Sequence, residues 1–147
     1  MNKSPLPSIG LFVLLAVCSI VAMPGCSDGR PQRAPISGQV LIDGKPLTMG
    51  VVRVIPENAR AAWAKIGPDG RFTFKTFEDG DGVVMGTHPL IVRANEWLSS
   101  TKVKWHAPKK YANQETSGLT VTIDGPNDTL TIPLTWDGGK PFIEIVK

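Results

Sequence analysis

The chain has few of the residues on which most catalytic and metal sites depend. Its 147 residues include two cysteines, two histidines and one tyrosine. The histidines, His88 and His106, belong to no His-x-x-Glu or His-Glu-x-x-His motif, which excludes a zinc-protease site of that kind. We therefore expect a protein that is not an enzyme and that uses no cofactor or metal. A site assembled from dispersed residues is the enzymatic alternative.

The chain also lacks a strong excess of charge of either sign. It has 16 Lys and Arg residues against 13 Asp and Glu residues, and it has no run of five like charges. Lys3 is the only charged side chain in positions 1–25, so 15 basic and 13 acidic residues follow that segment. A balance this even argues against a nucleic-acid partner.

Only one long apolar run is present, Ile9–Met23, and it lies between the charged residues Lys3 and Asp28. A membrane-spanning helix needs roughly 20 apolar residues. This run is shorter, and it ends at Pro24-Gly25, which breaks a helix. A basic start, a short apolar centre and small residues after it are typical of a secretory signal peptide. We expect the apolar centre of this signal peptide to be a helix that precedes the domain. A buried core helix and a transmembrane anchor are the alternatives.

The segment Ala22-Met-Pro-Gly-Cys26 resembles the lipobox of bacterial lipoproteins, in which a small residue precedes a cysteine that receives diacylglycerol. Gly25 fits this pattern, whereas Met23 stands where leucine is usual. Cys18 is a competing candidate, but cleavage there would leave an apolar tail. The resemblance implies that 1–25 is a lipoprotein signal peptide and that Cys26 is lipidated. Otherwise Cys26 is a free surface thiol.

A lipidated Cys26 implies a location in the cell envelope, anchored to a membrane and facing the periplasm or the cell surface. Residues 26–35 are polar and have no apolar periodicity, as a flexible tether requires. Residues 36–147 are then one domain, because about 110 residues suffice for a single hydrophobic core. This domain contains no cysteine, so it cannot depend on disulfides.

From position 36 onward, short runs rich in β-branched and aromatic residues alternate with turn residues, and no stretch has the helical period. We expect an all-β fold, an antiparallel β-sandwich of about seven or eight strands. The predicted strands occupy 36–42, 51–55, 61–66, 71–77, 88–93 with its entry at 83–85, 119–123, 129–135 and 142–146.

Turn residues predict how these strands pair. Glycine and proline at 43–47 predict a pair between 36–42 and 51–55, and Gly67-Pro-Asp-Gly70 predicts a hairpin between 61–66 and 71–77. The runs 119–123 and 129–135 flank a further turn.

Within 71–77 the alternation of Phe72, Phe74 and Thr76 with polar residues predicts one buried and one exposed face. Pro89 and Pro133 lie in predicted strands. Because proline cannot donate a ladder hydrogen bond, we expect those strands at a sheet edge or beside an irregularity.

Several of these motifs resemble those of carboxypeptidase-regulatory-like domains, whose fold is a transthyretin-like sandwich. The resemblance is carried by Gly38-Gln-Val-Leu-Ile-Asp-Gly-Lys-Pro-Leu47, Val51-Val-Arg-Val-Ile-Pro56, Gly67-Pro-Asp-Gly-Arg-Phe-Thr-Phe74 and Gly80-Asp-Gly-Val-Val-Met-Gly86. The segment Lys110–Thr122 is similar to one in small lipoproteins of planctomycete bacteria. The resemblance implies a non-catalytic domain. The related fold of the 5-hydroxyisourate hydrolases ends in Tyr-Arg-Gly-Ser, which this chain lacks.

Residues 95–117 interrupt the strand pattern and predict an extended loop over one end of the sandwich. Trp97, Trp105, His106 and Tyr111 lie in it, together with several lysines. Aromatic faces beside cations can stack on sugars or meet acidic polymers. The alternative is that these side chains cover the open end of the sandwich.

A second candidate site is Glu78-Asp-Gly-Asp-Gly82, in which Asp79 and Asp81 are weak candidates for calcium ligands. This segment supplies only three carboxylate side chains as ligands, whereas calcium takes six to eight oxygens. A solvated turn is therefore the favoured interpretation.

Together these patterns predict a membrane-tethered envelope lipoprotein that is not an enzyme and has a structural, adhesive or assembly role. The alternative is a lipoprotein that binds glycans or small ligands through 95–117. The expected partners are membrane lipid at the anchor and, beyond it, envelope proteins or glycans.

Overall fold

The structure, a computed structural model, describes Met1 and residues 29–147. The predicted signal peptide (1–25) and Cys26 lie outside the described residues. The first strands along the chain are β1 (Arg33–Ala34), β2 (Ile36–Ile42), β3 (Lys45–Pro46), β4 (Val51–Val54), β5 (Ala62–Lys65), β6 (Arg71–Thr73) and β7 (Val83–Val84). They are followed by β8 (Gly86–Arg93), β9 (Asn95–Ser99), β10 (Lys102–Trp105), the 3-10 helix η1 (Lys109–Ala112), α1 (Gln114–Ser117), β11 (Leu119–Ile123), β12 (Asn127–Leu134) and β13 (Phe142–Ile145).

Two sheets pack face to face and form the sandwich that the sequence predicts. One sheet has the order β11-β8-β4-β5, and in the other β2 lies between β12 and the short strands β3 and β6. All pairs are antiparallel except β2 with β12, which run parallel. This pair arises because the chain crosses from β11 in one sheet to β12 in the other and then follows the direction of β2.

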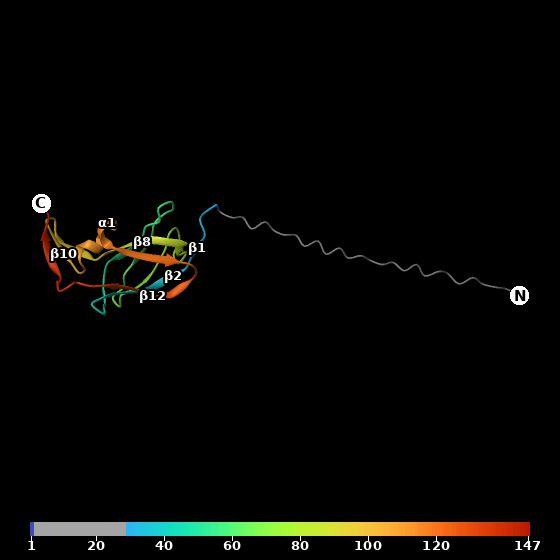
Figure 1. Cartoon of the computed structure of the whole chain (residues 1–147), viewed down its shortest axis with the longest axis horizontal. Helices are drawn as coiled ribbons and strands as arrows, with labels where there is room; N and C mark the ends of the chain where they lie inside the picture. The colour runs from blue at the N-terminus through green and yellow to red at the C-terminus, as the bar shows by residue number, and fades with distance from the viewer. Residues whose placement is uncertain (2–28) are drawn as a thin grey trace.

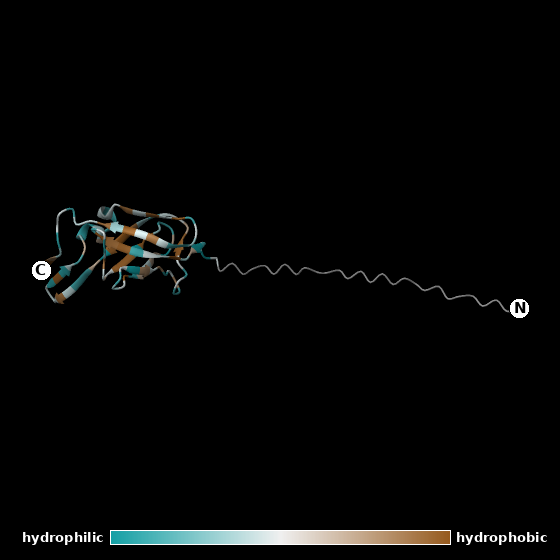
Figure 2. Ribbon diagram, turned by 90° about the horizontal axis from the view of Figure 1, so that it is seen from below, coloured by the Kyte–Doolittle hydropathy of each residue, from teal (hydrophilic) through white to brown (hydrophobic). Residues whose placement is uncertain are grey.

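The core lies between these two sheets and takes apolar residues from both. Val40 and Phe74 on one side and Val52, Val54 and Val92 on the other are almost completely inaccessible. Apolar segments accordingly concentrate in the strands at the centre of the domain (Figure 2). The face of Phe72, Phe74 and Thr76 predicted to be buried is confirmed, with exposed fractions of 4, 0 and 5%.

The predicted strands exist, but the predicted pair between 36–42 and 51–55 is wrong, and the predicted hairpin between 61–66 and 71–77 is confirmed only in part. β2 forms a two-residue hairpin with β3 through Asp43-Gly44, whose positive φ values of 48° and 77° suit such a turn. The chain then crosses to the other sheet, where β4 pairs with β5 and β8. The turn at 67–70 joins β5 to β6, which belong to different sheets, but just beyond β6 Lys75 pairs with Trp63 through two backbone hydrogen bonds of 2.9 and 3.0 Å. β11 and β12 also lie in different sheets. The segments 47–50, 67–70 and 124–126 therefore carry the chain from one sheet to the other.

The two prolines are accommodated in different ways. Pro133 lies in β12, which is an edge strand, as expected. Pro89 lies in β8, which is inside its sheet, between β11 and β4. The Pro89 carbonyl accepts from Ile55 N (2.9 Å), so its nitrogen faces β4 just beyond Val54, where that strand ends. Only the reciprocal bond from residue 89 to the Ile55 carbonyl is missing, and it falls at the end of the ladder.

The ordered domain begins earlier than the predicted boundary at residue 36. Within the predicted tether 26–35, residues 33–34 form β1 and pair with β7. Gly82 permits this contact: a Cβ built on it would lie 1.8 Å from the Ala34 carbonyl oxygen, and its φ is +82°. β1 lies at one end of the molecule, and β10 and the C-terminus lie at the other (Figure 1).

Candidate functional site

The segment 95–117 is a folded unit, which corrects the prediction of an extended loop. β9 continues from β8 after Ala94, and β10 returns beside it as a hairpin. β13, the last strand of the chain, pairs with the other side of β10. The resulting order β13-β10-β9 makes a three-stranded sheet, here called the distal sheet. It lies at the end of the domain that carries the C-terminus (Figure 1).

One face of the distal sheet is covered by η1. Val103 and Trp105 of β10 pack against Ala112, and all three are buried. The Trp105 indole N–H donates to Glu144 Oε2 (2.8 Å), and Lys109 Nζ donates to Glu144 Oε1 (2.6 Å). The hydrogen bond from Lys109, followed by that from Trp105, holds the pKa of Glu144 below its usual value against the opposing effect of desolvation. Trp105 is therefore a structural residue that ties β10 to β13 and η1.

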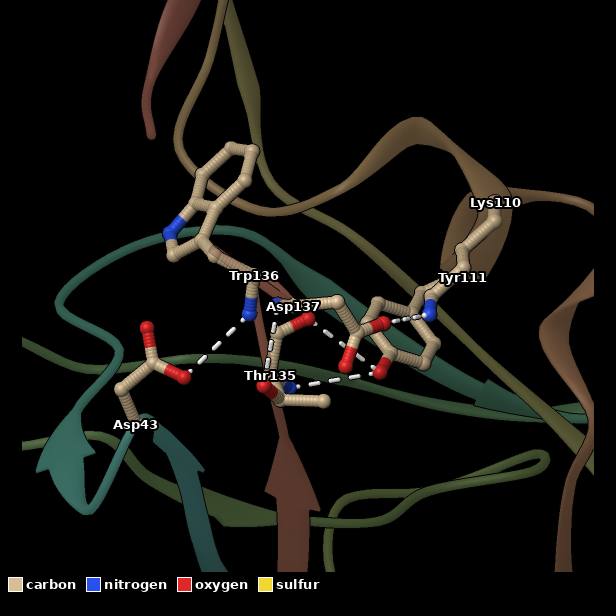
Figure 3. A network of polar contacts seen from close by, with 6 residues as sticks. All are labelled: Asp43, Lys110, Tyr111, Thr135, Trp136 and Asp137. Atoms are coloured by element: carbon tan, nitrogen blue, oxygen red, sulfur yellow. Dashed lines mark hydrogen bonds and ion pairs between the residues drawn. The ribbon is translucent and has the colours of Figure 1, made fainter. Parts of the chain in front are cut away.

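Tyr111 is also buried, and its hydroxyl joins η1 to the end of β12. It accepts from Thr135 N (3.2 Å) and donates to Thr135 O (3.4 Å), as Figure 3 shows. Beside it, Lys110 Nζ donates to Asp137 Oδ2 (2.5 Å), and Trp136 N donates to Asp43 Oδ1 (3.2 Å). The hydrogen bond between Lys110 and Asp137 raises the pKa of the amine and lowers that of the carboxyl.

His106 and Trp97, the other two predicted ligand residues, lie on opposite faces of the distal sheet. Trp97 is paired with Val103 in the register, so it shares the face of Trp105, and it is 61% exposed. His106 is half-buried, and its Nε2 lies 2.9 Å from Glu96 Oε1. Since a carboxylate only accepts, the imidazole N–H donates in this contact. The structure therefore leaves Trp97 as the one exposed aromatic of the four.

The distal sheet concentrates the exposed apolar side chains of the domain. Within residues 29–147, six of the eight exposed large apolar residues lie on β9, on β13 or directly after β13: Trp97, Leu98, Phe142, Ile143, Ile145 and Val146. Ile143 and Ile145 are 56 and 69% exposed and are paired with Lys104 and Lys102. The sequence predicts 142–146 only as the last strand and not as part of a site. Its apolar residues fall at both odd and even positions, which indicates that at least one face of the strand is exposed and apolar.

The outer edge of β13 has no partner strand among the described residues. Val146 N donates to Thr101 O (2.8 Å), so even-numbered backbone groups in this region point toward β10. Those of Ile143 and Ile145 therefore point away, toward the open edge. An extended chain could pair with them.

The candidate calcium ligands make other contacts. Asp79 is a solvent-exposed carboxylate that accepts from Lys75 Nζ (2.7 Å). Asp81 accepts from the backbone N–H groups of Thr76 (2.7 Å) and Phe77 (3.0 Å), and it lies 3.2 Å from Arg33 Nε. No group of three His, Cys, Asp or Glu side chains able to hold a metal ion occurs within the described residues.

The same contacts shift the pKa of Asp81. Burial raises it, but the backbone N–H groups of the turn and the charge of Arg33 together outweigh burial and lower the pKa below its ordinary value. Asp81 is thus held as a carboxylate that closes the turn after β6 and fastens β1 to it.

The predicted lipidation site, Cys26, cannot be placed because it lies outside the described residues. Within the described part of the chain, no helix is long and apolar enough to cross a membrane.

Compared with known proteins, the chain matches no family model, no curated protein and no solved structure.

Proposed function

We propose that this chain is a lipid-anchored protein of the bacterial envelope that is not an enzyme and that docks an extended, acidic segment of a partner protein on β13. The lipid anchor is Cys26, within the lipobox-like segment that precedes the domain. The observation that carries the docking proposal is the open edge of β13, since four of the eight exposed large apolar side chains of residues 29–147 lie on β13 or directly after it. Addition of a strand to such an edge is a common mode of peptide recognition.

The charges around β13 favour an acidic partner. Lys102 and Lys104 flank Ile145 and Ile143 on the adjacent strand, and Lys140 and Lys147 lie at the two ends of β13. Lys104 is 3.9 Å from Glu96, and the other three lysines have no ion pair within the described residues. An incoming strand that alternates acidic and apolar residues would meet opposite charges and apolar side chains.

Self-pairing of β13 is disfavoured by the charge of Glu144. In an antiparallel pair of two copies, the register that places Ile143 opposite Ile145 also places Glu144 opposite Glu144. Like charges directly opposite one another destabilise a strand pair. A partner whose acidic side chains lie on the face of Lys102 and Lys104 avoids this conflict.

Binding of short peptides to the full chain in neutral detergent tests the docking surface. A peptide that alternates valine and glutamate is expected to bind, and one that alternates valine and lysine is not. Ile143→Pro removes an outward N–H and is expected to abolish binding, whereas the control Ile143→Thr keeps it. Binding that is unchanged in Ile143→Pro, or no binding of the acidic peptide, would refute this function.

The anchor is tested separately by fatty-acid labelling in bacteria. Label is expected on the wild-type protein and not on Cys26→Ser. Label that survives this substitution would overturn the assignment of Cys26.

The glycan-binding alternative has less support, since two of its three aromatic residues, Trp105 and Tyr111, are buried and hydrogen-bonded. A glycan-array signal that is lost in Trp97→Ala would favour it over protein docking.

A further inference from the structure

Three arginine side chains converge on one aromatic ring at the end of the domain that contains β1. The guanidinium carbons of Arg30, Arg33 and Arg60 lie 4.3, 5.0 and 5.1 Å from the centroid of the Phe77 ring. They come from two separate segments, one before β2 and one before β5. Because each is so close to the same centroid, no two lie more than about 10 Å apart, roughly the screening length at physiological salt, and their fields add.

Among the described residues, Arg33 and Arg60 of this arginine cluster carry more positive charge than the carboxylate that pairs with them, Asp81. Asp81 is the carboxylate that pairs with Arg33, and it is also engaged by backbone N–H groups. Arg60 is exposed and makes no ion pair with a carboxylate of the described chain. Stacking on a ring is worth only about 0.5–1 kcal/mol per exposed cation, so a bound anion would stabilise this arrangement further.

A small hollow of about 110 Å³ lies beside the ring. Arg33, Arg60, Phe77, Asn58 and Thr76 contribute to its wall, and none of its lining residues is acidic. At roughly 30 Å³ per water molecule, it has the volume of three or four waters, which is enough for the bonded atoms of one phosphate group. Planar guanidinium groups bind phosphate through two parallel hydrogen bonds, and a side-chain amide can add another.

The position of this cluster in the chain suggests the source of the phosphate. Arg30 is four residues from Cys26, and four residues span at most about 14 Å. If Cys26 carries lipid, Arg30 must therefore lie within the headgroup region of the membrane or next to it. This step rests on the proposed function; the convergence of the arginines does not.

We propose that Arg30, Arg33 and Arg60, gathered around Phe77, form a binding site for a phosphate group. On a membrane-anchored protein that group is the headgroup of an anionic phospholipid, and free phosphate is the other source of the same chemistry. Occupation of the site would hold the β1 end of the domain against the membrane and direct the distal sheet away from it.

Calorimetric titration of the full chain in neutral detergent micelles tests this site. The two probes are inorganic phosphate and phosphatidylglycerol added to the micelles. Phosphatidylglycerol is expected to bind and to bind more weakly at high salt. Arg60→Gln, at an exposed position, is expected to weaken binding roughly tenfold or more, since it removes a charge-assisted contact. Arg30→Gln is a second variant with the same expectation.

Arg53→Gln is the matched control, because Arg53 is an exposed arginine on β4 away from this ring and its substitution changes the net charge equally. Phosphatidylglycerol binding that is weakened by Arg60→Gln but not by Arg53→Gln supports a headgroup site. Equal binding of inorganic phosphate, with the same pattern of variants, supports the site with free phosphate as its source. No binding of either probe, or equal weakening in both variants, overturns the proposal.

The same titration of Cys26→Ser separates this inference from the proposed function. Phosphate binding that persists in Cys26→Ser shows that the site does not need the anchor. Phosphate binding by a wild-type chain that takes up no fatty-acid label leaves the site intact and refutes the anchor. Labelled Cys26 with no binding of either probe refutes the site alone.

Discussion

Asp81 offers a sharp test of how the N-terminal strand is fastened to the domain. Asp81→Asn keeps the shape of the side chain but replaces one carboxylate oxygen with an NH₂ group. That group cannot accept from Phe77 N, and the ion pair with Arg33 is lost. Either orientation of the amide leaves one backbone N–H of the turn facing another donor.

The magnitude follows from these contacts. A hydrogen bond to a charged group contributes about 1.5–3 kcal/mol, and an N–H left without an acceptor costs about 1–3 kcal/mol; because the two overlap, we expect a loss of roughly 2–4 kcal/mol in the free energy of unfolding. Asp79→Asn is the matched control on the same turn. Its carboxylate is 90% exposed and pairs only with Lys75, so the expected change is below about 0.5 kcal/mol.

Urea unfolding of both variants at several pH values measures these differences. The pKa of Asp81 is lowered in the folded protein, so its stabilising effect is complete above the unfolded pKa of about 3.9 and is lost as the pH falls through the folded pKa. The difference between wild type and Asp81→Asn should therefore be constant near neutral pH and shrink in acid below about pH 4. A difference that is independent of pH, or no larger than that of Asp79→Asn, would refute this account of the turn.

Three further substitutions test the packing. Gly82→Ala should cost at least about 1–3 kcal/mol, because it combines a positive φ with a collision against the Ala34 carbonyl; wild-type resistance of the 29–35 segment to proteolysis would contradict this. Tyr111→Phe should lower the free energy of unfolding by about 1–2 kcal/mol, and with it the urea midpoint, since Thr135 N loses its acceptor. An unchanged midpoint would argue against this hydrogen bond. Phe74→Ala, at a site with no exposed surface, should cost about 3–5 kcal/mol in the same assay; a smaller loss would indicate that the core collapses around the cavity.

The individual strands could be predicted from the sequence because their side chains alternate. β2 occupies Ile36–Ile42, as the pattern indicates, and β11 likewise matches the predicted run 119–123. Short strands such as β1 and β3 are too brief to show any period. The partners of the strands could not be predicted, because a turn residue such as Gly44 or Gly70 reports only that the chain reverses. Whether the next strand stays in the same sheet depends on contacts that are distant in sequence.

The candidate site was predictable only in part. The run Lys102-Val-Lys-Trp105 alternates polar and apolar residues, which is a strand signal, but its lysines and tryptophan also fit a loop. The hydrogen bond that holds the Trp105 indole is accepted by Glu144, which is 39 positions further along the chain. The arginine cluster has no signature in the sequence at all, since Phe77 and Arg60 lie far from Arg30.

The order in which the strands occur along the chain has a consequence for synthesis. β2 is among the first strands to be made, but its parallel partner β12 is almost the last. β10 likewise waits for β13, so Trp105 has no partner for its indole N–H until the final residues emerge. One edge of the β2 sheet and the distal sheet therefore close late, and partly synthesised chains expose an unpaired strand edge at each of them. The domain thus depends on residues 127–145 to finish surfaces that were begun much earlier.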